Sequence, residues 1–208
     1  MARKNISDRF LYIPVIILFV NFIYRLIDQS KIIKIFPLDY VNDISSYLAQ
    51  LFFLKECGFL KICPYWYNGF ITFTGYSPGW YFFSFPIYIL TNNILITAYI
   101  SLILMLLIGF IIIYIIGKQE KLSKIKIFSF FIFFFANAIA IGNFIRLGRL
   151  TSLFGWISSL GLIAIILYYK EKKLTKYFPL IFIPTYFILI LSHSQEFILF
   201  NFILLGFF

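Results

Sequence analysis

The sequence predicts an all-α protein, a polytopic bundle of transmembrane helices. The chain has 208 residues, of which 62% are hydrophobic and 12% charged. Its mean hydropathy is +0.95, outside the range of ordinary soluble domains. Several apolar runs approach the ~20 residues that cross a hydrocarbon core. They are continuous rather than alternating, which indicates helices and not strands.

These runs divide the chain into six expected spans within one transmembrane domain, residues 1–208. The spans fall at about 10–27, 94–117, 127–145, 152–169, 177–192 and 197–208. The first run has no small-residue cleavage site after it and is interpreted as a retained anchor. The last run is still apolar at Phe208, so we expect a fragment truncated at its C-terminus.

A large loop, residues 28–93, separates the first two expected spans. Within it the stretch WYFFSFPIYIL, residues 80–90, is apolar but too short to cross a bilayer, and it contains Pro86. We therefore expect an interfacial or re-entrant helix there. Counting it as a span would also place the lysine-rich segments described next on the outer side.

The formal net charge of +10 is best explained by topology rather than by nucleic-acid binding. Residues 1–9 carry a net charge of +2, and residues 118–126 and 170–176 carry +3 each, whereas residues 28–93 are neutral. Lysine and arginine concentrate on the cytoplasmic side of membrane proteins. We therefore expect a multi-pass protein of the plasma membrane, with a cytoplasmic N-terminus and residues 28–93 outside.

The segment PLDYVNDISSY, residues 37–47, places Asp39 and Asp43 four residues apart, on one face of a helix. The polar residues Ser46, Tyr47 and Gln50 extend this face. Apolar residues recur on the opposite face, namely Val41, Ile44, Leu48 and Leu51. The pattern predicts an amphipathic helix on the outer membrane surface, with its carboxylates in water. Asp39 could equally be an N-cap, whereas Asp43 is expected beyond the first turn, as a functional or simply solvated acid.

Aromatic residues and tight-turn residues alternate in CPYWYNGFITFTGYSPGWYFF, residues 63–83. Trp66 and Tyr76 are candidates for stacking on a sugar ring, although each could be an interfacial anchor. Cys57 and Cys63 are the only cysteines. An oxidising exterior permits a disulfide between them, and free buried thiols fit equally well.

Basic and polar residues also stand at the expected outer ends of later spans. Arg146 and Arg149 break the positive-inside trend, and a guanidinium binds phosphate through two parallel hydrogen bonds. A lipid phosphate is one partner, and snorkelling to headgroups is the alternative. His193 and Glu196 form a further polar pair, which could bind substrate or lie in a solvated loop.

This arrangement resembles the C-fold glycosyltransferases (GT-C), and most closely the YfhO-like and 6-pyruvoyl-tetrahydropterin synthase-related multi-span membrane families. The resemblance covers the first span, the acidic loop, residues 66–69 and residues 76–79. It implies transfer of a sugar from a polyprenyl-phosphate carrier at the outer face, with Asp43 or Asp39 as catalytic base. Pro78-Gly79 replaces the family's Pro-Pro turn, and Ile44 follows Asp43 where protein mannosyltransferases have an adjacent acidic pair.

The sequence therefore predicts a membrane glycosyltransferase of the cell envelope, with a membrane lipid and a lipid-linked sugar donor as partners and no nucleic acid. The sequence contains no cofactor motif. A divalent metal ion remains an alternative, although no Asp-x-Asp metal motif is present. No Gly-rich phosphate loop indicates a nucleotide-sugar donor. The alternatives are a transporter or flippase for a lipid-linked glycan and a non-catalytic assembly subunit. Oligomeric state is not indicated.

Overall fold

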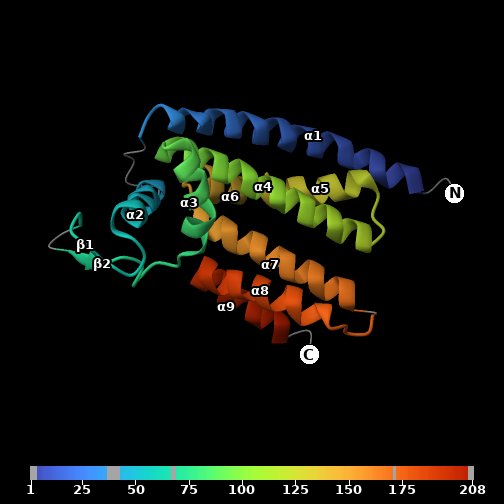
Figure 1. The fold of residues 1–208 in the computed structure, drawn as a ribbon. Coiled ribbons are helices and arrows are strands. Elements are labelled where there is room, and N and C mark those ends of the chain that lie inside the picture. Colours follow the sequence, from blue (N-terminus) through green and yellow to red (C-terminus); the bar gives the residue numbers. More distant parts are fainter. Residues whose placement is uncertain (1–3, 37–42, 67–68, 171, 206–208) are drawn as a thin grey trace.

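The computed structural model describes residues 4–36, 43–66, 69–170 and 172–205. Among these described residues 78% are in helices and 2% in strands, so the fold class is all-α, as the sequence predicts. Figure 1 shows the chain as a row of long helices with a cluster of short elements at one end.

The elements follow the chain in a simple order. The helices are α1 (Lys4–Gln29), the short 3₁₀ helix η1 (Ser30–Ile33), α2 (Ile44–Cys57), α3 (Gly79–Thr91), α4 (Ile94–Gln119), α5 (Lys124–Phe135), α6 (Ala138–Ala140), the π-helix η2 (Ile141–Arg146), α7 (Leu150–Tyr169), α8 (Tyr177–Ser192) and α9 (Ser194–Leu205). A two-residue antiparallel ladder, β1 (Ile62–Cys63) with β2 (Phe70–Ile71), forms the only sheet among the described residues.

Among the described residues, three helical segments are long and apolar enough to cross a membrane. They are Tyr12–Ile33, Ile94–Gln119 and Leu150–Tyr169. The fifth and sixth expected spans become α8 and α9, of 16 and 12 residues. At 1.5 Å per residue α8 reaches about 24 Å, short of the ~30 Å hydrocarbon core. The structure describes α9 as far as Leu205. Of the six expected spans, the described residues therefore support three by length and composition, or four with the bent pair described next.

The third expected span, 127–145, is not one continuous helix. α5 ends at Phe135, and the following helical segment, residues 138–146, is bent from it by 47°. Asn137 lies at the break: its Oδ1 accepts the backbone N–H groups of Ile139 and Ala140, while its Nδ2 donates to Phe133 O. One amide thus satisfies backbone groups on both sides of the bend.

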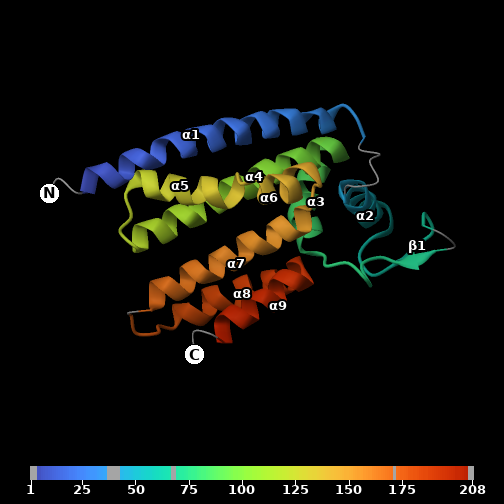
Figure 2. The same cartoon turned by 180° about the vertical axis from the view of Figure 1, so that it is seen from behind.

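The long helices run side by side, and the connections between them separate the two ends of the bundle (Figures 1 and 2). The start of α1, the α4–α5 connection and the α7–α8 connection lie at one end, called here the lysine end. α2, the β1–β2 hairpin and α3 lie at the opposite end, called here the loop end. All three segments that the charge pattern assigns to the cytoplasm therefore reach the same end.

α3 is the short helix expected at residues 80–90, and it lies across the loop end of the bundle (Figure 1). Trp80 and Tyr81 are fully buried, and Trp80 Nε1 donates to Ser101 Oγ of α4 at 3.3 Å. Gly79 permits a close approach to α8, because a Cβ there would lie 2.8 Å from Leu191 O. α3 is therefore packed into the bundle and helps to position the elements around it.

Candidate functional site

Asp43 immediately precedes α2, so its expected place beyond the first helical turn is wrong. The side chain makes no capping bond to α2. Its Oδ2 instead accepts a hydrogen bond from Nε of Arg149 at 3.2 Å. The backbone N–H of Asp43 donates to Leu147 O at 3.0 Å. The start of α2 is thus joined to the start of α7, 106 residues further along the chain.

Gly148 explains how these two segments come so close. Its φ is +64°, in the left-handed region that favours glycine, and a Cβ there would lie 2.8 Å from Cβ of Ile44. The turn between η2 and α7 therefore packs directly on the first residue of α2. Arg149, the next residue, is carried to Asp43 by this contact.

The Asp43–Arg149 ion pair is accessible to solvent. The side chains retain 47% and 48% exposure. Ion pairs this exposed contribute only about 0.2–1 kcal/mol, because water screens the charges. A stronger anionic partner, such as a phosphate, could therefore replace the carboxylate on Arg149 at small cost.

α2 is not the amphipathic surface helix that the sequence predicts, because its polar face is only partly exposed to water. Ile44, Leu48 and Leu51 are buried as expected, but Gln50 on the supposed polar face is also only 6% exposed. Tyr47 is half-buried. Its hydroxyl accepts a hydrogen bond from Oγ1 of Thr151 at 3.2 Å. α2 is packed on both faces and anchored to α7.

Tyr47 lies within the electrostatic reach of several candidate residues. Burial raises the pKa of its hydroxyl, and the hydrogen bond from Thr151 opposes that shift. The charges of Asp43, Arg149 and Glu196 also act on this hydroxyl. Tyr47 is therefore a neutral hydroxyl among charged groups of α2, α7 and α9. The sequence pattern placed Tyr47 only on the polar face of the expected surface helix and gave it no role in the site.

Glu196 and His193 do not form a solvated loop. Glu196 is 5% exposed, and its Oε1 accepts a hydrogen bond from Oγ of Ser152, near the start of α7. Its Oε2 contacts Nδ1 of His193, which lies between α8 and α9. Gly155 leaves room for this acid, because a Cβ there would lie 3.1 Å from Cβ of Glu196. Ser152 is a second residue that sequence reasoning missed.

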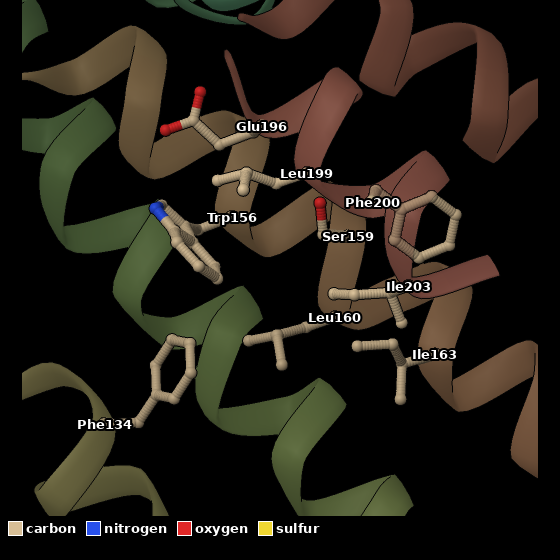
Figure 3. A pocket seen from close by; sticks show the side chains of 9 residues that line it. All are labelled: Phe134, Trp156, Ser159, Leu160, Ile163, Glu196, Leu199, Phe200 and Ile203. Atoms are coloured by element: carbon tan, nitrogen blue, oxygen red, sulfur yellow. The ribbon is translucent and has the colours of Figure 1, made fainter. Parts of the chain in front are cut away.

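Glu196 stands at the head of a narrow pocket between α7 and α9 (Figure 3). The lining is mostly apolar, with Trp156 and Phe200 among its residues and Ser159 as a polar exception. The cavity volume of about 80 Å³ is far below the ~300–1,000 Å³ of small-molecule sites. This pocket is therefore too small to hold a sugar.

The remaining candidates are distributed over the loop end. Arg146 is exposed at the end of η2, and its charge acts on Asp28. Trp66 is exposed, and its ring lies 6.1 Å from that of Phe53. Phe53 is ten residues after Asp43, which is about 15 Å along α2. Tyr76 is also exposed. Asp39 lies outside the described residues, so its expected place beside Asp43 stays a prediction.

Cys57 and Cys63 form a disulfide with a Cα–Cα distance of 5.3 Å. Of the two interpretations of the cysteines, the structure has the disulfide. It joins the end of α2 to β1, and such bonds persist in oxidising compartments. Within the described ranges, no three His, Cys, Asp or Glu side chains gather as metal ligands.

The site is therefore a set of polar groups at the loop end, contributed by α2, α7 and the α8–α9 junction. Asp43 is paired with Arg149, Tyr47 with Thr151, and Glu196 with Ser152 and His193. Comparisons of the chain with protein-family models, curated proteins and solved structures found no match.

Proposed function

We propose that the protein is a membrane glycosyltransferase that moves a sugar from a polyprenyl-phosphate donor to an acceptor hydroxyl at the outer membrane face. The observation that carries this proposal is the exposed Asp43–Arg149 pair at the loop end. It combines a carboxylate that can accept a proton with a guanidinium that can bind phosphate. The disulfide in the same loop supports an outer location.

In the proposed reaction the donor phosphate replaces Asp43 as the partner of Arg149. The freed Asp43 carboxylate accepts the proton of the acceptor hydroxyl as its oxygen bonds to the anomeric carbon. The bond between that carbon and the phosphate oxygen breaks, and the electron pair leaves with the lipid phosphate. Arg149 stabilises the charge that develops there.

Transfer from a polyprenyl-phosphate-linked hexose, measured in membranes that contain the full-length protein, tests the proposal. Asp43→Asn retains size and hydrogen bonding but loses the basic carboxylate, so we expect a loss of about 10²–10⁴-fold. Asp28→Asn is the matched control: Asp28 is paired with Lys31, also at the loop end, and should retain activity. Undiminished transfer by Asp43→Asn at equal protein level would exclude Asp43 as the base and favour an assembly subunit.

Two observations favour a transporter or flippase as the second candidate. The bent α5–η2 segment is a broken helix, and Glu196 is an acid buried between helices. In proteoliposomes with a fluorescent polyprenyl-phosphate glycan, this function predicts translocation that Glu196→Gln abolishes and Asp43→Asn spares. The transferase predicts no translocation.

A further inference from the structure

Two hollows at the lysine end share two lining residues, Leu167 and Lys170. The first is a groove of about 650 Å³ between the ends of α7, α8 and α9. The second, of about 400 Å³, is lined in part by Lys121, Lys170 and Lys172, with Glu120 as the acid among its described residues. An apolar groove and a basic surface therefore meet at Lys170.

The floor of the groove is an aromatic ladder on one face of α8. Phe178, Phe182 and Tyr186 are spaced four residues apart. Their rings stack at centroid distances of 5.1 Å and 5.9 Å, with interplanar angles of 21° and 12°. The ring of Tyr169 of α7 meets that of Phe178 edge to face, with the centroids 5.1 Å apart. The α8 part alone is about 12 Å long.

The chemistry of the two hollows specifies one kind of occupant. A ladder of rings offers an apolar surface for a hydrocarbon chain, whereas lysines at its end offer positive charge for an anion. A zwitterionic lipid would gain little from these lysines, because its headgroup has no net charge. An amphiphile with a hydrocarbon chain and a negative headgroup uses both features.

We propose that this groove binds an anionic phospholipid, with one acyl chain along the Phe178–Phe182–Tyr186 ladder and the headgroup phosphate at Lys170 and Lys121. The site lies at the opposite end of the bundle from Asp43 and does not depend on the proposed sugar transfer. It gives the lysine end a specific lipid ligand in addition to its place in the charge pattern.

Fluorescence quenching by brominated lipids tests the position of the chain. The full-length Phe182→Trp variant is placed in vesicles that contain either brominated phosphatidylglycerol or brominated phosphatidylcholine, and the signal of the parent protein is subtracted. We expect phosphatidylglycerol to quench the introduced indole at a severalfold lower mole fraction. Phe130→Trp, at an exposed position of α5, is the control and should be quenched equally by both lipids.

Native mass spectrometry of the otherwise unmodified protein tests the headgroup contacts. Lys170→Gln should lower the retention of phosphatidylglycerol about fivefold, the effect of one lysine near a lipid phosphate. Lys173→Gln, an exposed lysine of the same segment, should leave it unchanged. Equal quenching of the Phe182→Trp variant by the two lipids, shielding of its indole from both, or equal loss in both lysine variants would each overturn the proposal.

Discussion

Asp43 and Arg149 are far apart in the sequence, and a single glycine between η2 and α7 brings them together. Gly148 has a positive φ and a neighbour, Ile44, that leaves no space for a side chain. The arginine candidates could be named from sequence because guanidinium groups at an apolar helix end are unusual. The sequence could not show which of these two arginines contacts Asp43, because that contact depends on the turn at Gly148.

Gly148→Ala is expected to destabilise the protein and to separate the ion pair. The added Cβ meets Ile44, and alanine is strained at φ +64° by about 1–3 kcal/mol. Thermal unfolding of the purified protein would measure the loss. Gly142→Ala is the control, since a Cβ there meets nothing within 4 Å. Equal melting temperatures for the two variants would contradict the tight contact at Gly148.

Arg149→Lys is expected to weaken use of the lipid donor more than use of the acceptor. Lysine retains the positive charge but loses the planar fork that binds two phosphate oxygens. The measurement is the KM for each substrate in membranes, with Arg146→Lys as the comparison. A rise confined to the acceptor KM would show that Arg149 binds the acceptor and not the lipid donor.

At the scale of elements, a disulfide and a side-chain hydrogen bond fix two short connections of the fold. The disulfide joins α2 to the β1–β2 hairpin, and Asn137 caps the bend after α5. Cysteine count alone left the bond open, because two thiols six residues apart can also remain free. The bend was missed because Asn137 lies in an apolar run whose composition predicts an unbroken span.

Removal of the disulfide by Cys57→Ser with Cys63→Ser is expected to lower stability by about 2 kcal/mol, the chain-entropy effect of so short a closed loop. Because Asp43 is at the other end of α2, transfer by the folded protein should persist. Unfolding curves with and without reductant check the first part, and transfer assays the second. Stability that is insensitive to reductant would show that the bond contributes nothing.

At the scale of the whole molecule, composition predicts the helical class and the charge pattern predicts which connections share an end. Both predictions rest on many residues together, so an error of a few residues in a helix boundary does not change them. The packing could not be predicted, because helices such as α4 and α8 are apolar on all sides and show no preferred face. The bounds of α8 agree with the expected segment 177–192, but its 16 residues are too few for the span that the apolar run indicates.

The proposed function requires that the loop end faces the outside and the lysine end the cytoplasm. Both native cysteines are in the disulfide, so one introduced cysteine is the only free thiol. A membrane-impermeant maleimide applied to intact cells should label Tyr76→Cys and not Lys172→Cys, both at exposed positions. Permeabilised cells should show labelling of both. Labelling of Lys172→Cys from outside, with Tyr76→Cys protected, would place the Asp43–Arg149 pair in the cytoplasm and contradict the account.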